Sequence, residues 1–340
     1  MTNSQPLLLF VAMVPAGLLS FVIIWAIRPL LLQIALAKPN ARSSHRIPTP
    51  QGAGVAVVAA TLIAAAAVIA LAGAADSRIP VAVFAATLFI AAVGFADDLR
   101  SIPVVPRLLL QGLAVATVIF TAPENLRIAA PCPLWLERCL LLLAGLWFVN
   151  LVNFMDGLDL MTVAEAVPIT GALVLLGWLG ELPLSTTITA AALFGAMLGF
   201  APFNRPVAKI FLGDVGSLPI GLLVGWCLLQ LAWHQQFAAA LLLPLYYLAD
   251  ATATLLRRMA RREPFWTAHR THFYQRATDN GLSVSRVVSE VFLLNIVLAA
   301  LAIGSVITSS AAITGLLLVV GGIATAHLMY RFSRRQTSLG

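Results

Sequence analysis

The chain has 340 residues, of which 60% are hydrophobic and only 10% charged, and its formal net charge is +7. Apolar runs of about 18 or more residues recur along its whole length, and each is long enough to span a bilayer, which excludes a soluble protein. Positive charge in such a chain is typical of the loops that set membrane topology, so we expect no nucleic-acid partner.

Eleven apolar segments are predicted to cross a membrane as helices. They comprise residues 7–28, 52–73, 79–96, 107–122, 136–153, 162–180, 186–203, 217–233, 237–256, 286–308 and 311–331. Lysine and arginine concentrate in the loops that follow the odd-numbered segments, and basic residues are retained on the cytoplasmic side. We therefore expect the N-terminus outside and the C-terminus in the cytoplasm. Small residues in Ala53–Ala67 and Ala190–Gly199 predict close helix packing.

The predicted fold is an all-α, polytopic membrane bundle of about eleven transmembrane helices, with residues 1–340 as one domain. Polar clusters interrupt the apolar segments, and the predicted topology places all of them on one face of the membrane. They comprise residues 38–54, 97–98, 150–159, 204–217 and 257–276. Carboxylates, amides, histidines and arginines that converge at one membrane surface predict a site for magnesium and phosphate chemistry.

The first cluster, residues 38–54, is rich in proline and glycine, which specify a shaped loop rather than a random linker. Its candidate substrate-binding side chains are Lys38, Arg42 and His45. Such cationic side chains suit the phosphate of a lipid substrate, and they suit the anionic lipids of the membrane surface equally well. Both interpretations stay open.

The second cluster is the pair Asp97 and Asp98, at the cytoplasmic end of the third segment. Two adjacent carboxylates do not ionise together comfortably without a cation, so such a pair holds a proton or faces a metal or a base. The alternative is an acidic cap that ends the helix. The pair by itself does not distinguish between these roles.

The third cluster has a polar side chain at every third position near the inner end of the fifth segment. These side chains are Asn150, Asn153, Asp156 and Asp159. A spacing of three keeps them on roughly one face of a helix. A polar face beside lipid is costly, so we expect it to line a hydrated cleft, where its oxygen atoms suit Mg²⁺. A polar seam between helices is the alternative.

The fourth cluster, residues 204–217, begins with the amide of Asn204 and ends at the start of the eighth segment. Near that end, Asp214 lies between Gly213 and Gly216. Glycine permits close backbone approach to a phosphate, and the N–H groups at a helix start are directed at anions. Asp214 also suits the simpler role of an N-cap residue.

The fifth cluster belongs to a basic segment, residues 257–285, that is predicted to be a cytoplasmic substrate-binding loop. Its side chains that suit phosphate are His269, Arg270, His272 and Arg276. Arginine grips phosphate oxygens bidentately, so this group favours a diphosphate ligand, whereas no nearby cysteine or third histidine supports zinc. The alternative is a basic anchor that sets topology. Asp250 lies little more than a turn before the segment, in a position to orient it.

In this order, the five motifs resemble those of the polyprenyl-phosphate N-acetylhexosamine-1-phosphate transferases, a superfamily that includes the phospho-N-acetylmuramoyl-pentapeptide transferase of peptidoglycan synthesis. The spelling HRTHFYQR resembles the branch that initiates O-antigen synthesis. The resemblance implies an enzyme of the inner membrane, working at the cytoplasmic face in lipopolysaccharide synthesis. Its expected reaction transfers N-acetylhexosamine-1-phosphate from a UDP-sugar to polyprenyl (undecaprenyl) phosphate and releases UMP.

The resemblance also implies roles for individual residues. Asp97 and Asp98 would activate or position the lipid phosphate as the catalytic pair, and Asp214 and Asn153 would bind Mg²⁺, with Mn²⁺ as an alternative ion. Leu160 departs from the family pattern, which usually has glycine there, and this changes the backbone freedom of the turn. The residues assigned to substrate binding are Asn150, Asp156, Asp159, Asn204, His269, Arg270, His272, Arg276, Lys38, Arg42 and His45.

Two alternative functions stay open at this point. One is a phospho-N-acetylmuramoyl-pentapeptide transferase, and the other, from a different class, is a membrane transporter or lipid scramblase. Transporters place their functional polar groups near the bilayer midplane, often within repeats, whereas the clusters here lie at helix ends. The sequence does not distinguish N-acetylglucosamine, N-acetylquinovosamine and N-acetylfucosamine as the sugar, and it leaves a homodimer as an option.

Overall fold

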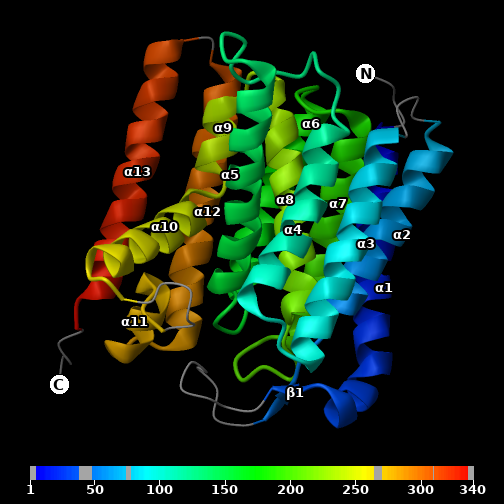
Figure 1. Ribbon diagram of the computed structural model, residues 1–340, viewed down its shortest axis with the longest axis vertical. Coiled ribbons are helices and arrows are strands. Elements are labelled where there is room, and N and C mark those ends of the chain that lie inside the picture. The colour runs from blue at the N-terminus through cyan, green and yellow to red at the C-terminus, as the bar shows by residue number, and fades with distance from the viewer. Residues whose placement is uncertain (1–4, 38–47, 74–77, 264–269, 309, 336–340) are drawn as a thin grey trace.

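The computed structural model describes residues 5–37, 48–73, 78–263, 270–308 and 310–335, and most of them are helical (Figure 1). The helices are α1 (Gln5–Ile34), α2 (Gly54–Leu71), α3 (Arg78–Leu99), α4 (Val104–Phe120), α5 (Leu134–Met155), α6 (Met161–Trp178), α7 (Leu184–Phe200), α8 (Asp214–Trp233), α9 (Phe237–Leu242), α10 (Leu245–Ala260), α11 (Phe273–Asp279), α12 (Val284–Ile307) and α13 (Ala311–Ser333). A 3₁₀ turn, η1 (Ala201–Phe203), follows α7. Two short strands, β1 (Leu36–Ala37) and β2 (Thr49–Pro50), pair antiparallel, with Leu36 opposite Pro50.

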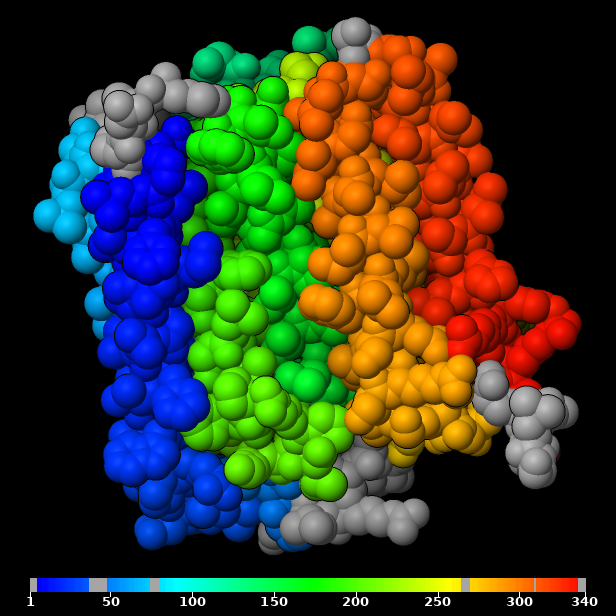
Figure 2. Space-filling view, turned by 180° about the vertical axis from the view of Figure 1, so that it is seen from behind, coloured from blue at the N-terminus to red at the C-terminus, as the bar shows by residue number. Residues whose placement is uncertain are grey.

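Nine of the helices that the structure describes are long and apolar enough to cross a membrane, and α4 is a shorter apolar helix. The predicted fold class, an all-α polytopic membrane protein, is therefore confirmed. The start of α1 and the end of α13 lie at opposite ends of the bundle in Figure 1, as the predicted topology requires. In the view from behind, α1, α7, α6, α12 and α13 form a continuous wall in that order (Figure 2).

The segment predicted as a single span at 237–256 differs in the structure. It is divided into α9, which ends at Leu242, and α10, which begins at Leu245. Pro244 lies at the break and has no backbone N–H to continue the hydrogen bonds of a helix. Beyond the break, α10 runs obliquely to the other helices (Figure 1). Its far end carries the start of the basic segment, so the break decides where that segment lies.

Close helix packing is seen where small residues predict it. A Cβ atom added to Gly195 of α7 would lie 1.9 Å from the carbonyl oxygen of Met13 in α1. One turn further, a Cβ on Gly199 would lie 2.2 Å from the carbonyl oxygen of Gly17. Larger side chains would push α1 and α7 apart, so these glycines set the distance between the two helices.

The segment that leads into α8 is held by backbone hydrogen bonds to β2 and to the start of α2. The N–H of Phe211 donates to the carbonyl of Pro50 (2.8 Å), and the N–H of Gly54 donates to the carbonyl of Leu212 (2.9 Å). A Cβ on Gly94 of α3 would lie 2.3 Å from a carbonyl oxygen at the start of α8. The beginnings of α2 and α8 and the last turns of α3 therefore meet at one place, which carries the aspartate motifs.

Candidate functional site

The carboxylate of Asp98, at the end of α3, holds the first turn of α8. Its Oδ1 accepts a hydrogen bond from the N–H of Asp214, and its Oδ2 accepts one from the N–H of Val215, both at 3.0 Å. A Cβ on Gly213 would lie 2.5 Å from Oδ2 of Asp98, so only glycine leaves room for this contact. The first amides of a helix have no partner within the helix. Asp98 is therefore a cap, and it caps a helix distant in sequence rather than its own.

Asp97 faces a different set of partners. Its Oδ2 forms an ion pair with Nη1 of Arg107 at 2.8 Å, and its Oδ1 accepts a hydrogen bond from the N–H of Ile102 at 2.5 Å. The carboxyl groups of Asp97 and Asp214 also lie close to each other. Sequence reasoning missed Arg107, although it lies in the first turn of α4 and only ten positions after Asp97.

Asp214 is joined to the end of α5 through Asn153. The Nδ2 group of Asn153 donates to Oδ1 of Asp214 at 2.7 Å and to Oγ of Ser217 at 2.9 Å. Because both bonds use the nitrogen, the side-chain oxygen of Asn153 is the atom that would take a cation. Ser217, which sequence reasoning also missed, fixes this orientation of the amide.

The donor set at this place fits a magnesium ion. Asp97, Asp98 and Asp214 bring three carboxylates together, and in the described part of the chain Arg107 is the one cation that pairs with them. Within those same residues, no group of three histidine, cysteine or acidic side chains has the arrangement of a metal cage. Mg²⁺ usually takes one or two carboxylates and completes its shell with water and substrate phosphates. Asp214 and Asn153 are the residues that would hold it.

Asn150 lies away from this cluster. Its buried Nδ2 donates to Oε1 of Gln111 in α4 and to the carbonyl of Leu146, both at 2.8 Å. Of the two interpretations of the third polar cluster, the polar seam between helices is the one that the structure shows for Asn150. Its role in substrate binding stays a prediction.

The turn between α5 and α6 carries the two remaining carboxylates of the motif. Asp156 accepts a hydrogen bond from the hydroxyl of Thr162, and Asp159 accepts one from the N–H of Ala208 at 3.0 Å. Burial raises the pKa of Asp156 to about 7, and the negative charges of Asp98 and Asp159 act in the same direction. The ionised form of Asp156 would therefore be stabilised by a nearby cation or basic side chain.

The same turn is held from the other side by Asn204. Its Oδ1 accepts a hydrogen bond from the N–H of Leu160 at 2.7 Å, and its Nδ2 donates to the carbonyl of Ile210 at 3.0 Å. The backbone of Leu160 is left-handed, with φ at 62°, a conformation that glycine adopts without strain. The expected effect of Leu160 on this turn is thus visible in its backbone. Asn204 is buried and joins two loops, and its predicted substrate contact stays untested.

Asp250 organises the start of the basic segment. This fully buried carboxylate accepts hydrogen bonds from the N–H groups of Phe273 (3.0 Å) and Tyr274 (3.1 Å), and its Oδ1 lies 3.2 Å from Nδ1 of His272. Asp250 thus orients the segment, as its position in the sequence indicates. His272 is itself buried, so in this structure it positions α11 and does not face solvent.

Tyr274 joins the basic segment to the turn of carboxylates. Its hydroxyl donates to the carbonyl of Phe154 at 3.0 Å. A Cβ on Gly157 would lie 2.1 Å from that hydroxyl, so the glycine of the DG pair leaves the space that the tyrosine occupies. The two motifs are far apart in sequence, and this contact brings the basic and acidic groups to one site.

The arginines of the segment fall into two groups. The guanidinium groups of Arg257 and Arg276 lie 5.1 and 5.8 Å from the centroid of the Phe273 ring. Arg270 instead pairs with Asp279 at 3.1 Å. Arg257 and Phe273 were not predicted as site residues. Lys38, Arg42, His45 and His269 lie outside the described residues, so their positions stay predictions.

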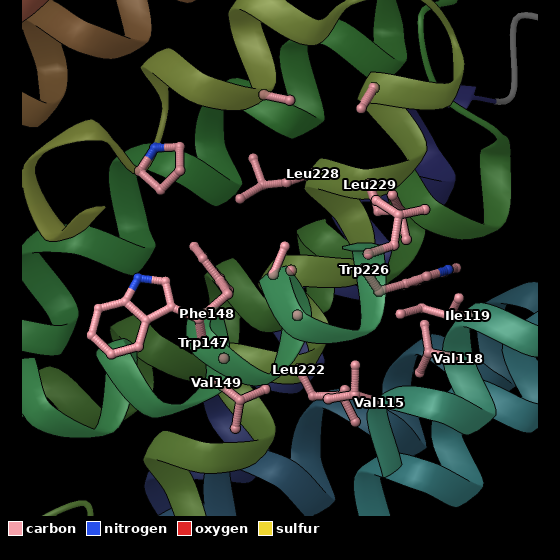
Figure 3. Close-up of a pocket in the computed structure, with 18 of the residues that line it drawn as sticks. Val115, Val118, Ile119, Trp147, Phe148, Val149, Leu222, Trp226, Leu228 and Leu229 are labelled. Atoms are coloured by element: carbon pink, nitrogen blue, oxygen red, sulfur yellow. The ribbon is translucent and has the colours of Figure 1, made fainter. Parts of the chain in front are cut away.

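An apolar cavity of about 240 Å³ lies between α4, α5, α8 and α9 (Figure 3). Figure 3 shows its wall of Val115, Ile119, Phe148, Leu222 and Trp226. Val149 and Gly221 also line it, and each is one helical turn from a residue of the Asn153–Asp214 cluster. The cavity thus extends from near the carboxylates into the membrane-spanning part of the bundle.

The comparisons with known proteins agree with this site. Residues 80–232 match the sequence pattern of glycosyl transferase family 4. This range runs from α3 to the last turn of α8 and contains the carboxylate cluster and the cavity wall on α4, α5 and α8.

Two relatives share a shorter segment. The phospho-N-acetylmuramoyl-pentapeptide-transferase of Shouchella clausii is 40% identical over 87 residues, which cover 26% of each chain. The protein of the same name from Enterococcus faecalis is 32% identical over 110 residues, 32% of this chain and 33% of that one. The matched part of the chain thus spans 26% to 33% of the length of these relatives.

A further relative is similar over most of its length. The probable undecaprenyl-phosphate N-acetylglucosaminyl 1-phosphate transferase of Bacillus subtilis is 24% identical over 320 residues, 89% of this chain and 87% of that one. Together with the match over residues 80–232, these relatives confirm the resemblance that the motifs predict. Over residues 80–232, the chain is thus similar to glycosyl transferase family 4.

Proposed function

We propose that the protein is a magnesium-dependent membrane enzyme that transfers N-acetylhexosamine-1-phosphate from a UDP-sugar to polyprenyl phosphate. The observation that carries this proposal is that Asp97, Asp98 and Asp214 gather within about a helical turn of an apolar cavity, and that a basic segment docks at the end of α5, which also carries Asn153. A lipid phosphate approaches from the membrane, and a nucleotide diphosphate approaches from water. A site at the end of the bundle is accessible to both.

In the proposed reaction, an oxygen of the lipid phosphate attacks the β-phosphorus of the UDP-sugar. A new phosphorus–oxygen bond forms there, the bond to the UMP oxygen breaks, and UMP leaves with the electron pair. Mg²⁺ on Asp214 and Asn153 would neutralise phosphate charge during the transfer. Asp97, with Arg107 beside it, is placed to align the attacking phosphate, and Asp98 supports the loop that carries Asp214.

The basic segment supplies the complementary charge. Arg257 of α10 and Arg276 of α11 both lie beside Phe273, and the contacts of Asp250 and Tyr274 hold α11 against the turn of carboxylates. Arginine binds phosphate oxygens in a bidentate manner, so these side chains suit the diphosphate of the nucleotide sugar. A transporter does not need such a pairing of acidic and basic groups at the helix ends.

We also propose the location and the sugar. The excess of lysine and arginine at the end of the bundle that carries the site supports the cytoplasmic face of the inner membrane. N-acetylglucosamine is the favoured sugar, because the Bacillus subtilis relative is named for it and aligns over most of the chain. The first membrane step of an O-antigen is the proposed pathway position, and the muramoyl-pentapeptide substrate is the second candidate, which the 40% identical segment supports.

The test is an assay of the purified protein with polyprenyl phosphate and one UDP-sugar at a time. UMP release with UDP-N-acetylglucosamine, together with a polyprenyl-diphosphate product, is the expected result. UMP release only with UDP-N-acetylmuramoyl-pentapeptide would favour the second candidate. A protein that moves lipid or sugar across vesicles without releasing any UMP would overturn the proposed enzyme class.

The cavity provides a separate test of the lipid substrate. We propose that it accommodates part of the polyprenyl chain, because its wall is apolar and begins near the carboxylates. Ala144 lines it and is exposed, so Ala144→Trp would obstruct it with little damage to the core. This variant is expected to raise the KM for polyprenyl phosphate and leave the KM for the UDP-sugar unchanged. Equal KM values for both substrates in the variant and the wild type would contradict this placement.

A further inference from the structure

Gln111 and Asn150, which we call the amide pair, form a buried contact between α4 and α5. Nδ2 of Asn150 donates to Oε1 of Gln111 at 2.8 Å, and the two residues are only 7% and 1% exposed, respectively. The same nitrogen donates to the carbonyl of Leu146, also at 2.8 Å, which fixes the orientation of the Asn150 amide. The proposed reaction uses neither side chain of the amide pair.

Gln111 is the one polar residue among the buried residues of α4, a helix that the structure describes in full. The others are Ala114, Val115, Val118 and Ile119, which recur at the spacing of one helical face. Polar side chains within a membrane bundle are costly unless they bond to a neighbouring helix. The apolar contacts hold α4 and α5 together, whereas the directed bond of the amide pair fixes their position along each other.

Each member of the amide pair lies one helical turn from a residue of the proposed site. Gln111 comes four positions after Arg107 in α4, and residues at this spacing share one face of a helix. Asn150 comes three positions before Asn153 in α5, with the same consequence. The amide pair therefore joins the two helices directly beside the residues that they contribute to the site.

These contacts form a closed ring. Arg107 pairs with Asp97 at 2.8 Å, and the carboxyl group of Asp97 lies close to that of Asp214. Asn153 donates to Asp214 at 2.7 Å. The amide pair completes the ring through α4 and α5. A change in the amide pair would therefore move Arg107 relative to the two residues that would hold the metal ion.

We propose that the amide pair positions Arg107 to bind the phosphate of the lipid substrate. The side chain of Arg107 is 26% exposed, so a ligand can reach it. Its ion pair with Asp97 uses Nη1, and a guanidinium group has further N–H donors that suit phosphate oxygens. Gln111 and Asn150 are positioning residues, because they act through Arg107. The choice of ligand rests on the proposed function.

The test measures the Kd for polyprenyl phosphate and the Tm of the purified protein. Gln111→Met keeps the length of the side chain and removes the oxygen that accepts the bond from Asn150. We expect the Kd to rise about tenfold, which corresponds to a loss of about 1.4 kcal/mol of binding free energy. The Tm should fall, because the buried amide of Asn150 loses its partner on α4.

Two further variants separate positioning from stability. The double variant of Gln111→Met and Asn150→Leu leaves neither amide unpaired, so its Tm should return toward that of the wild type while its Kd stays raised. The exchange of the two amides, Gln111→Asn with Asn150→Gln, keeps their combined length and should restore a Kd near that of the wild type. These two variants decide the question even if Gln111→Met folds poorly.

The amide pair should have no effect on binding when Arg107 is missing. Arg107→Ala should raise the Kd for polyprenyl phosphate, and adding Gln111→Met should raise it no further. The matched control is Asn295→Leu in α12, which removes a similar buried bond between helices, from Nδ2 of Asn295 to Oε2 of Glu165 at 2.6 Å. This control should lower the Tm and leave the Kd unchanged.

Four outcomes would overturn the inference. These are an unchanged Kd in Gln111→Met, a wild-type Kd in the double apolar variant, additive effects of Gln111→Met and Arg107→Ala, or a Kd that rises as much in Asn295→Leu. A wild-type protein that binds polyprenyl phosphate but releases no UMP with any UDP-sugar would instead contradict the proposed function. The Kd values would still decide the role of the amide pair in that case.

Discussion

The side chain of Asp98 accepts a hydrogen bond from the backbone N–H of Asp214, which lies 116 positions later in the chain, at 3.0 Å. A second bond, to the next amide, completes a bidentate contact with the first turn of α8. Asp250 makes the same kind of contact with the amides of Phe273 and Tyr274 in α11. The half-buried carboxylate of Asp98 and the fully buried one of Asp250 thus hold the two helices that carry Asp214 and the basic segment.

The contact between Asp98 and α8 predicts that Asp98→Asn loses both stability and turnover. An amide can accept from one of the two N–H groups, but its NH₂ group would face the other donor. The expected loss is about 1–3 kcal/mol of unfolding free energy. Thermal unfolding of the purified protein measures it, together with UMP release. An Asp98→Asn protein with the Tm of the wild type would show that the cap contributes little.

Asp214→Asn is expected to behave differently. Its side chain can still accept the hydrogen bond from Asn153, and the substitution removes one of three clustered negative charges. The Tm should therefore be kept or raised, whereas turnover should fall by at least about a hundredfold because electrostatic stabilisation is lost. Parallel Tm and UMP measurements on both variants distinguish the structural carboxylate from the metal-binding one. A Tm loss as large as that of Asp98→Asn would contradict this division of roles.

Magnesium should stabilise the folded protein even without substrates, because the carboxylates repel each other less around a cation. At a free magnesium concentration of about 100 times its Kd, binding raises the free energy of unfolding by about 2.7 kcal/mol. The measurement is the Tm in a magnesium titration, with reversal by a chelator. Asp214→Asn is the matched control and should show a much smaller rise. Equal rises in both proteins would place the ion elsewhere.

Gly157→Ala should weaken binding of the nucleotide sugar, because the added Cβ would lie 2.1 Å from the Tyr274 hydroxyl and would displace α11. We expect the Kd for the UDP-sugar to rise about tenfold or more, and a tenfold rise corresponds to a loss of about 1.4 kcal/mol of binding free energy. The matched control is Gly112→Ala in α4, where a Cβ would meet nothing within 4 Å. That substitution should leave the Kd unchanged and stabilise the helix slightly. If Gly157→Ala binds as the wild type does, the contact with Tyr274 does not position the segment.

The fold class could be predicted from composition because a bilayer imposes one length on every helix that spans it. Residues 237–256 are an instructive exception. These residues are apolar and numerous enough to span the bilayer. Pro244 is the one local sign of a break, and many helices accommodate a proline with only a kink. The direction of α10 after the break depends on Asp250 and its partners in α11. Such contacts between distant segments leave no periodic pattern in the sequence.

The motifs identified where the polar groups gather, but not which atoms each one contacts. The partners of Asp98 are backbone amides, which every residue has, so no side-chain pattern reveals them. Asn150 and Asn153 share one helical stripe, yet only Asn153 contacts Asp214, because Gln111 of the neighbouring α4 binds Asn150. The spacing of three predicts a common face but does not say where the cleft ends and the helix interface begins.

Leu160 provides the last prediction, on stability. Its backbone has φ at 62° while its side chain packs against the core. A β-branched residue is disfavoured there, so Leu160→Val should lower the unfolding free energy by more than loss of a methylene alone would. The matched control is Leu184→Val, at a similarly half-buried position in the first turn of a regular helix. Chemical or thermal unfolding of both variants measures the difference. Equal losses at the two positions would mean that the turn at Leu160 relaxes freely, and that Asn204 does not hold it in the left-handed conformation.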